Sequence, residues 1–211
     1  MHDDALSPEQ RRALRALSPA AERGFYLAGG SALCLRLAHR RSIDLDLFRT
    51  GNFDSEQLLR ELHAAGVQTE RAATQPNTVS FEIEGVETSL MSFGYAPLEP
   101  PEVGLGVPVA SLRDIAAMKI EAVASRGARK DFVDLYFICQ ERGLGVLGAL
   151  DAFIARFASA NPDVLHRVKA LTYFEDAERE PELLMLRPVE WRQVRGYFER
   201  EAQAWWDKAM L

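Results

Sequence analysis

The glycine pair Gly29-Gly30 and the following Ser31 combine residue types that contact phosphate groups. They follow a short apolar run at residues 25–28, which predicts a buried strand that enters a tight turn. Glycines let the backbone approach a ligand closely, and the free amides at the start of the next helix attract phosphate. Ser31, which we expect to cap a helix over residues 32–38, adds a hydroxyl donor. A plain turn between strand and helix is the alternative interpretation.

Asp44 and Asp46 lie in residues 42–48, where apolar and acidic residues alternate with period two. The alternation predicts a strand with both carboxylates on one face, about 6.5 Å apart at Cα. Such a pair holds Mg²⁺ or Mn²⁺ ions that also bind phosphate oxygens. An exposed acidic face is the alternative, but acids bordered by Ile43 and Leu45 repel each other unless a cation compensates them. Together, the turn and the acidic strand favour a site for a metal and a phosphate group.

Further strands and helices are predicted around these residues. A helix over residues 7–18 begins at Ser7, and a second one runs from a capping residue, Asp54, to Gly66. Strands are predicted over residues 67–72, 78–84 and 86–93, the last two joined as a hairpin. Beyond residue 108 every element is predicted to be helical, over residues 111–125, 130–142, 146–158, 162–174 and 189–210.

This order of elements predicts an α+β protein in two parts. Residues 1–108 form a small mixed β-sheet with flanking helices, and residues 109–211 form a C-terminal helical domain. The boundary is placed in the segment 97–108, which is rich in proline and glycine.

The composition indicates an ordinary globular protein. Its 211 residues are 47% hydrophobic and 27% charged, and 25 basic against 31 acidic residues give a formal charge of −6. This charge argues against strong non-specific binding of nucleic acid, although a local basic patch is compatible with it. Cys34 and Cys139 have no metal-ligand spacing and are expected in the core. No leader or membrane-spanning segment is expected, so the predicted location is cytoplasmic.

Segments around the turn and the acidic strand resemble the signature of the AbiEii/AbiGii-type nucleotidyltransferases, members of the DNA-polymerase-β-like superfamily. Later segments match further motifs of that family in order and rough spacing. The resemblance covers residues 25–136 and rests on residues 27–33, 39–48, 111–119, Arg126 and residues 130–136. It implies a nucleotidyltransferase core on a small mixed sheet, followed by a helical domain that closes over the nucleotide.

The resemblance gives the motif residues of the first part the roles that their chemistry indicates. Ser31 contacts the phosphates of the incoming nucleotide, in the turn formed by Gly29 and Gly30. Asp44 and Asp46 bind the catalytic metals, Mg²⁺ or Mn²⁺.

Five charged residues of the second part complete the predicted site. Lys119 and Arg126 are seven residues apart on one predicted helix, so they share a face and meet the triphosphate together. Lys130 and Asp131 are expected to bind the nucleotide as well. Asp134 is expected to face inward, to pair with Arg126 or Lys130, and to act with Lys119 in catalysis. A solvated helix face for the first two residues and a helix-capping role for Asp131 are the alternatives.

The basic turn His39-Arg40-Arg41 precedes the acidic strand. We interpret it as an exposed turn, and steering of anionic substrates is the alternative.

One position departs from the pattern of the superfamily. Polymerase-β-like transferases carry a third carboxylate on a neighbouring strand, and the aligned residue here is Ser89. A serine is neither a strong metal ligand nor a base at neutral pH. Glu87, on the same predicted face as Ser89, and Glu82, on the partner strand, are the candidate substitutes.

These residues predict transfer of a nucleoside monophosphate from an NTP to an acceptor hydroxyl, with release of pyrophosphate. By resemblance, the acceptor is an RNA, such as a tRNA end, or a protein. The resemblance also implies the toxin of a toxin–antitoxin or phage-defence system, with a cognate antitoxin as partner. An inactive transferase fold that binds NTP or a protein is the alternative, and Ser89 favours it. A haloacid-dehalogenase-type phosphotransferase is disfavoured, because Leu47-Phe48 follows the acids where that chemistry needs a Gly-Thr-type turn.

Overall fold

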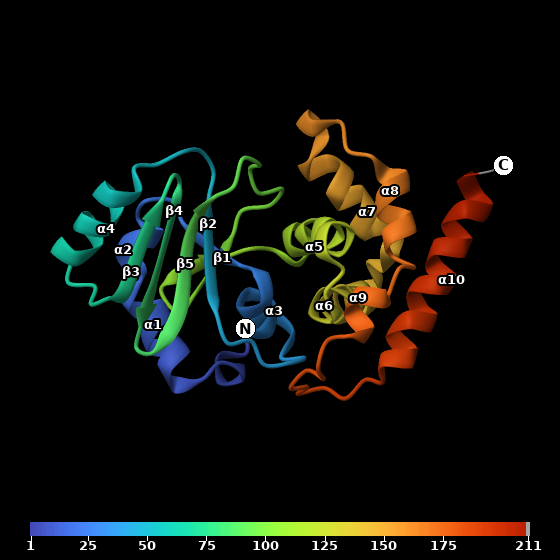
Figure 1. Ribbon diagram of the computed structural model, residues 1–211, viewed down its shortest axis with the longest axis horizontal. Helices are drawn as coiled ribbons and strands as arrows, with labels where there is room; N and C mark the ends of the chain where they lie inside the picture. The colour runs from blue at the N-terminus through green and yellow to red at the C-terminus, as the bar shows by residue number, and fades with distance from the viewer. Residues whose placement is uncertain (210–211) are drawn as a thin grey trace. The chain divides into compact units, whose positions relative to one another are not determined.

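The computed structural model describes residues 1–209, except for the side chain of Arg142. The chain divides into two compact units, Met1–Ser111 and Leu112–Leu211. The first unit contains a sheet and helices and the second is helical (Figure 1), so the predicted α+β class is confirmed. The predicted boundary after residue 108 falls within the last strand of the first unit. Among the described residues, no helix combines the length and apolar character needed to cross a bilayer.

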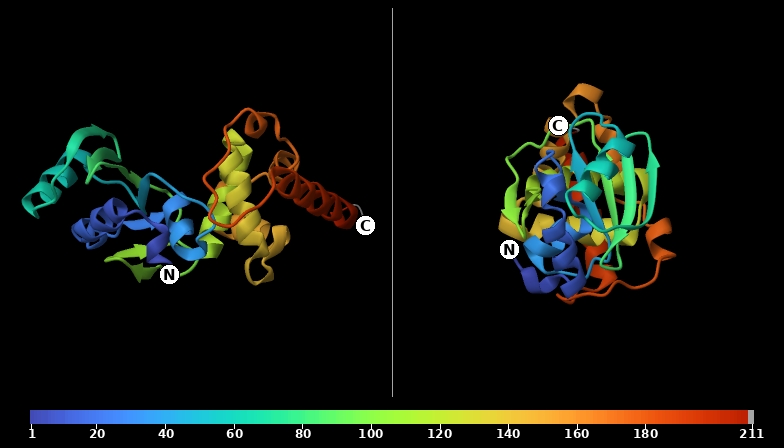
Figure 2. Two further views of the ribbon diagram at one scale, coloured as in Figure 1. Left: turned by 90° about the horizontal axis from the view of Figure 1, so that it is seen from below. Right: turned by 90° about the vertical axis from the view of Figure 1, so that its left-hand side faces the viewer.

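A seven-stranded mixed sheet forms the first unit, with the strand order β3-β4-β5-β2-β1-β7-β6. The strands are β1 Tyr26–Ala28, β2 Leu45–Arg49, β3 Glu70–Gln75, β4 Thr78–Ile83, β5 Val86–Ser92, β6 Glu102–Gly104 and β7 Val107–Val109. Strand β2 is antiparallel to β1 and parallel to β5, and β7 is parallel to β1. Because β3 and β6 form opposite edges, β1 and β2 lie in the middle of the sheet (Figure 2).

Burial alternates along the central strands as the period-two pattern predicts. Along β2, β4 and β5, every second side chain points to the inner face of the sheet. The buried side chains on that face include Leu45, Leu47, Val79 and Leu90. Asp46 lies between two of them and is half-buried. The core of the unit therefore packs on one face of the sheet, and the Asp46 side chain belongs to the other face.

Capping residues set the starts of two helices in the first unit. Ser7 accepts a hydrogen bond from the backbone N–H of Gln10 at the start of α1, and Asp54 accepts one from Gln57 at the start of α4. Both starts agree with the prediction from sequence. The helices of this unit are η1 Asp3–Ala5, α1 Pro8–Ala16, α2 Ser18–Ala21, α3 Gly29–Leu37 and α4 Ser55–Ala64.

The segment predicted as a linker contains two strands of the sheet. Strands β6 and β7 form a hairpin, and β7 pairs with β1 through Leu27 and Val109. The turn residues Leu105 and Gly106 both have positive φ, 52° and 87°, as a two-residue hairpin turn requires. Leucine is an unusual residue for that conformation, so the sequence carries no clear turn signal there.

Strand β3 begins later than predicted. Val67 was expected to start it, but its backbone N–H donates to the carbonyl of Leu62 at the end of α4. The strand therefore begins only at Glu70.

The helical unit packs around a cluster of aromatic rings. The Phe132 ring centre lies 5.1 Å from Phe174, 5.9 Å from Trp191 and 5.7 Å from Phe198. The helices are α5 Leu112–Arg126, α6 Arg129–Gln140, η2 Glu141–Gly143, α7 Gly145–Arg156, η3 Ala158–Ala160, α8 Val164–Ala170, α9 Glu175–Glu178 and α10 Trp191–Ala209. The helix predicted over residues 162–174 is shorter, and residue 210 of the last predicted helix lies outside the described residues.

Asp114 and Arg156 form a fully buried ion pair in this unit. Nη1 of Arg156 donates to Oδ1 of Asp114 over 2.7 Å and joins α7 to the start of α5. We expect Arg156→Met to lower the free energy of unfolding by about 3–5 kcal/mol, because a buried carboxylate loses its cation. Urea unfolding followed by circular dichroism measures this loss. The double variant Arg156→Met/Asp114→Leu should recover most of it, and an equal loss in both variants would contradict the expectation.

Candidate functional site

The Gly29-Gly30 turn lies tightly against polar side chains. A Cβ atom at Gly29 would lie 3.2 Å from Oδ2 of Asp46, and one at Gly30 would lie 2.7 Å from Oγ of Ser42 and 2.9 Å from Nη2 of Arg40. Gly29 also has a φ of +67°, which residues with a Cβ rarely adopt. Gly29 therefore needs the conformational freedom of glycine, whereas a Cβ at Gly30 would displace the side chains of Ser42 and Arg40. The Asp46 carboxylate lies directly beside the turn.

Helix α3 begins at Gly29, three residues earlier than predicted, and this changes the place of Ser31. Ser31 lies within the first turn of the helix and not at its cap, so the predicted capping role is wrong. Its buried hydroxyl donates to the backbone carbonyl of Asp44. That hydrogen bond joins the turn to the acidic segment. Contact between Ser31 and a nucleotide phosphate stays a prediction.

The two aspartates differ in their backbone setting. Asp46 lies within β2 opposite Ala28 of β1, whereas Asp44 precedes the first residue of the strand. Ile43 was expected to border them as part of an apolar face, but it is 75% exposed. The period-two pattern thus begins at Ser42, three residues before the first residue of β2. Asp44 is half-buried, and its backbone carbonyl accepts the hydrogen bond from Ser31.

Ser89 occupies the position next to Asp46 on the neighbouring parallel strand. The register pairs Asp46 with Ser89 and Ser89 with Ser80, and the two serine Oγ atoms are 3.4 Å apart. Glu87, which pairs with Glu82, is exposed. The carboxylate of Glu82 accepts a hydrogen bond from Arg71, so Glu87 is the less engaged of the two candidate acids.

The basic turn before β2 is largely buried. His39 is 0% exposed and Arg40 is 5% exposed, while Arg41 is exposed. The predicted exposed turn is therefore wrong for two of its three residues. Sequence reasoning offered Arg40 only for steering of anionic substrates and did not place it at the glycine turn, because only the fold brings its guanidinium against Gly30.

In the helical unit, a buried cluster joins α5 to α6. Nζ of Lys119 lies 2.7 Å from Oδ1 of Asp131 and 2.7 Å from Oδ2 of Asp134, and the Lys119 side chain is only 7% exposed. Arg126 donates from Nε and Nη2 to the two oxygens of Asp131. Lys119 and Arg126 therefore share one face of α5, and two cations are balanced by two carboxylates.

This cluster corrects two expectations. Asp131 does not cap α6, whose N-cap residue is Ala128, and Asp134 pairs with Lys119. Burial alone raises the pKa of Asp131, but hydrogen bonds from Arg126 and the charge of Lys119 outweigh it, so the pKa lies below its ordinary value. Lys130 is exposed. Nucleotide contacts by these five residues, and completion of the nucleotide site by the helical unit, stay predictions.

The acidic pair fits a metal that keeps most of its ligands outside the protein. Within the described residues, no group of three or more His, Cys, Asp and Glu side chains could enclose an ion. Mg²⁺ usually takes one or two carboxylates, waters and substrate phosphates. Asp46, whose carboxylate lies beside the glycine turn, and Asp44 match that limited donor set.

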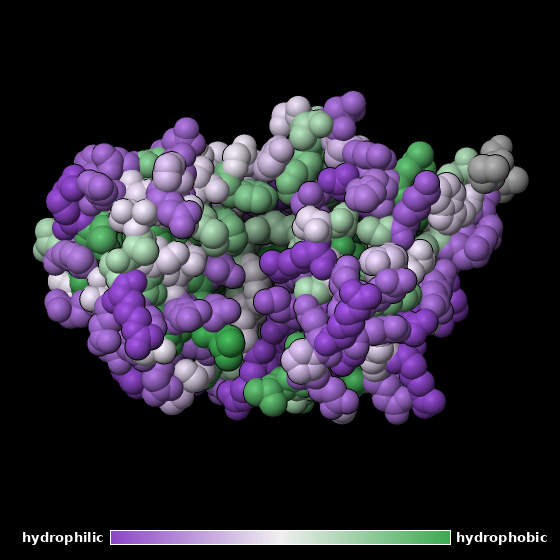
Figure 3. Space-filling view, viewed as in Figure 1, coloured by the Kyte–Doolittle hydropathy of each residue, from purple (hydrophilic) through white to green (hydrophobic). Residues whose placement is uncertain are grey.

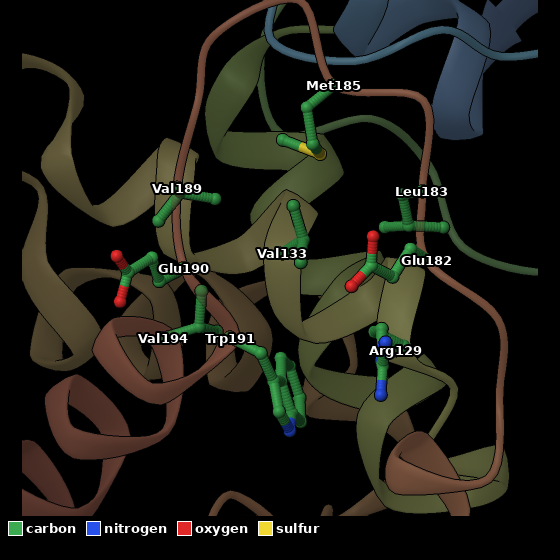
Figure 4. Close-up of a pocket in the computed structure, with 9 residues that line it drawn as sticks. All are labelled: Arg129, Val133, Glu182, Leu183, Met185, Val189, Glu190, Trp191 and Val194. Carbon is green, nitrogen blue, oxygen red and sulfur yellow. The ribbon is translucent and has the colours of Figure 1, made fainter.

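A cavity of about 300 Å³ lies in the helical unit (Figure 4). The Arg129 guanidinium carbon lies 5.2 Å from the ring centre of Trp191 on its wall. Glu182 and Glu190 also line this cavity, so carboxylates outnumber the cation and an anionic ligand is disfavoured.

On the face drawn in Figure 3, hydrophilic residues cover most of each unit, and strongly hydrophobic residues form small separate patches.

We expect Gly29→Ala to reduce both stability and any activity of the site. An alanine at this φ costs about 1–2 kcal/mol, and its methyl group would press on the Asp46 carboxylate. Gly66→Ala is the matched control, because Gly66 has a φ of +88° and open space around the added Cβ. Thermal unfolding and nucleotide binding by both variants measure the two effects. Equal nucleotide affinity in the two variants would exclude the turn from the site.

Comparison with known families identifies the class of this protein. Residues 12–96 and 91–210 match the family described as nucleotidyl transferase AbiEii toxin, type IV TA system. The chain therefore belongs to this family and is a nucleotidyltransferase, which confirms the resemblance found in the sequence. The matched residues include the glycine turn, the acidic strand and the α5–α6 cluster.

Individual proteins resemble this chain in sequence or in fold. An uncharacterized protein of Aquifex aeolicus (strain VF5) is 36% identical over 203 residues, which cover 94% of this chain and 96% of that protein. The structure resembles MenT4, a nucleotidyltransferase toxin from Mycobacterium tuberculosis, with a TM-score of 0.61, 15% identity and coverage of 92% of this chain and 80% of MenT4. It also resembles JHP933 from Helicobacter pylori, with a TM-score of 0.52, 16% identity and coverage of 94% and 92%. These two structures share its fold.

Proposed function

We propose that this protein transfers a nucleoside monophosphate from an NTP to an acceptor hydroxyl, with Mg²⁺ or Mn²⁺ as the metal. The observation that carries the proposal is the Asp46 carboxylate, whose Oδ2 would lie 3.2 Å from a Cβ at Gly29. The proposed metal-binding group thus lies beside the proposed phosphate-binding turn. The family match supports the reaction class.

The turn would bind the triphosphate, and the strand would bind the metal. The backbone amides at the start of α3 attract the triphosphate, and the helix dipole adds to that attraction. Asp44 and Asp46 would hold the metal, which supplies positive charge to the triphosphate oxygens when bound. The acceptor oxygen forms a bond to the α-phosphorus while the bond to the bridging oxygen breaks, so pyrophosphate leaves and the hydroxyl proton is lost to a base.

Glu87 is the proposed substitute for the missing third carboxylate. Ser89 occupies that position beside Asp46, and Glu87 lies two residues earlier on the same face of β5. We expect Glu87→Gln to slow transfer about tenfold or more and Glu82→Gln, whose parent carboxylate is held by Arg71, to have little effect. Full activity in both variants would show that neither acid replaces the third carboxylate.

The acceptor is proposed to be an RNA, such as a tRNA end, or a protein side chain. The family description names a toxin of a type IV toxin–antitoxin system, which supports a toxic role and a cognate antitoxin as partner. NTPs and these acceptors are abundant in the cytoplasm, where we propose that the protein acts.

Transfer of α-³²P label from each of the four NTPs, with Mg²⁺ or Mn²⁺, into total RNA and protein tests this function. Label in one fraction, dependent on the metal, would identify the nucleotide and the acceptor class together. Metal-dependent NTP binding without label in either fraction would favour the second candidate, an inactive binding module. The specific observation behind that candidate is Ser89 in register with Asp46.

A further inference from the structure

Four aromatic side chains form a row that begins next to Asp46. The ring centre of Phe48 lies 6.4 Å from that of Tyr26 and 5.7 Å from that of Phe93. The Phe93 ring in turn lies 5.6 Å from that of Tyr95. Tyr26 is 4% exposed, and the other three residues are half-buried. We call these four residues the aromatic row, and three of its rings are thus partly accessible.

The aromatic row shares one face of the sheet with Asp46. The register of β1 and β2 pairs Ala28 with Asp46 and Tyr26 with Phe48. Paired residues on neighbouring strands point to the same face, and so do residues two apart on one strand. Phe93 follows the last residue of β5, the parallel neighbour of β2, and its ring packs edge to face against Phe48. Asp46 and these rings therefore lie on the face opposite the core.

The row leads away from the glycine turn. Gly29 follows the last residue of β1, whereas Tyr26 is the first residue of that strand. Because β2 is antiparallel to β1, the step from Asp46 to Phe48 covers roughly 7 Å in the direction opposite to the turn. Asp46 thus lies between the turn on one side and the aromatic row on the other.

The geometry of the proposed reaction assigns a ligand to each side of Asp46. In phosphoryl transfer the attacking and the leaving oxygen lie roughly in line, on opposite sides of the phosphorus atom. The leaving pyrophosphate is proposed to lie at the glycine turn, so the acceptor hydroxyl must approach from the side of Phe48. The nucleoside of the NTP is attached to the α-phosphorus across this line. The aromatic row is therefore open to the acceptor.

We propose that the aromatic row binds the terminal nucleoside of an RNA acceptor, with the base against Phe48 and the hydroxyl at Asp46. The proposal rests on the proposed transfer function and selects the class of acceptor. Aromatic side chains stack on every base, because every base has a π face. A serine or threonine hydroxyl has no flat ring beside it. The net charge of −6 gives RNA no general attraction, so binding depends on such a local contact.

Phe48→Leu tests the proposal, because it removes the ring and keeps an apolar side chain. We expect the Kd for a short fluorescent single-stranded RNA with a free 3′ hydroxyl to rise about tenfold, with the Kd for NTP unchanged. The same RNA with an abasic residue at its 3′ end should bind wild type about tenfold more weakly, whereas Phe48→Leu should bind both RNAs equally. This coupling between one ring and one base reports direct contact.

Two further variants serve as controls. Phe81→Leu makes the same change on the inner face of the sheet, at a residue of β4 that is 3% exposed. It should lower stability in thermal unfolding but keep the preference for the RNA with the terminal base. Phe48→Tyr retains the ring and should keep this preference too. Phe93→Leu removes the next ring of the row and replaces Phe48→Leu in the test if that variant does not fold.

The outcomes separate the aromatic row from the transfer reaction. An equal affinity of wild type for the two RNAs, or an unchanged preference in Phe48→Leu, would overturn the proposal even if label is transferred to RNA. A higher Kd for NTP with unchanged RNA binding would also overturn it and place the base of the NTP at the row. Label in protein without RNA binding would overturn it in favour of a protein acceptor. Coupling between ring and base without any label transfer would support the row, and only the transfer function would then fail.

Discussion

Asp46→Asn is expected to slow nucleotidyl transfer by about 100-fold or more while leaving the fold intact. A metal at a phosphoryl-transfer site contributes several kcal/mol to the stabilisation of transition-state charge, and each 1.4 kcal/mol is about a factor of ten in rate. The Asn side chain carries an NH2 group in place of one carboxylate oxygen, so the negative charge that attracts the metal is lost. Single-turnover transfer of label from NTP, measured with saturating metal, gives the rate of the chemical step.

Two comparisons show whether the effect belongs to the acidic pair. Asp44→Asn should cause a loss of similar size, and the double variant should lose little more, because groups that act as a unit are not additive. Glu84→Gln makes the same chemical change at an exposed residue that pairs with Arg12 and should be neutral. A rate for Asp46→Asn within threefold of wild type would remove Asp46 from the reaction.

Lys119→Met is expected to lower the free energy of unfolding by about 3–5 kcal/mol, because it breaks a buried ion-pair cluster. The Lys119 ammonium lies 2.7 Å from both Asp131 and Asp134, and both carboxylates are 0% exposed. Removing the lysine leaves two buried negative charges near one remaining cation, Arg126. Against a typical total stability of about 5–15 kcal/mol, this loss is large. Chemical denaturation of wild type and variant measures it.

Lys130→Met is the control for this prediction. Lys130 is exposed at the start of α6, and exposed substitutions usually change stability by about 0.5 kcal/mol or less. An unfolding free energy of Lys119→Met equal to that of Lys130→Met would contradict the account of the cluster. The KM for NTP, measured with folded Lys119→Met, tests the separate prediction that Lys119 contacts the nucleotide.

Local patterns in the sequence predicted the elements whose conformation is decided locally. The alternation at residues 45–48 depends only on which face of β2 is buried, and Asp54 caps α4 through a bond to a residue three positions away. The hairpin at Glu84-Gly85 has positive φ at both residues, 54° and 73°, and its glycine signals such a turn. Leu105-Gly106 adopts the same kind of turn without a favourable first residue, and the β6–β7 hairpin was therefore missed.

Contacts between distant residues explain what the sequence could not show of the site. The buried position of Arg40 depends on its approach to Gly30, ten residues earlier in the chain. The pairing of Lys119 with Asp134 depends on how α5 packs against α6, which a helical period does not specify. Ser31 was placed at a helix cap because serine favours that position, but the flexible Gly29 and Gly30 allow α3 to begin earlier.

The central claim is that the glycine turn and the acidic pair form one site for a metal and a nucleotide. Equilibrium binding of a non-transferable NTP analogue, measured against Mg²⁺ concentration, tests it without an acceptor. We expect wild type to bind the analogue at least about tenfold more tightly with Mg²⁺, and an Asp44→Ala/Asp46→Ala double variant to show no such dependence. Equal Mg²⁺ dependence in the double variant would place the metal elsewhere and contradict the account.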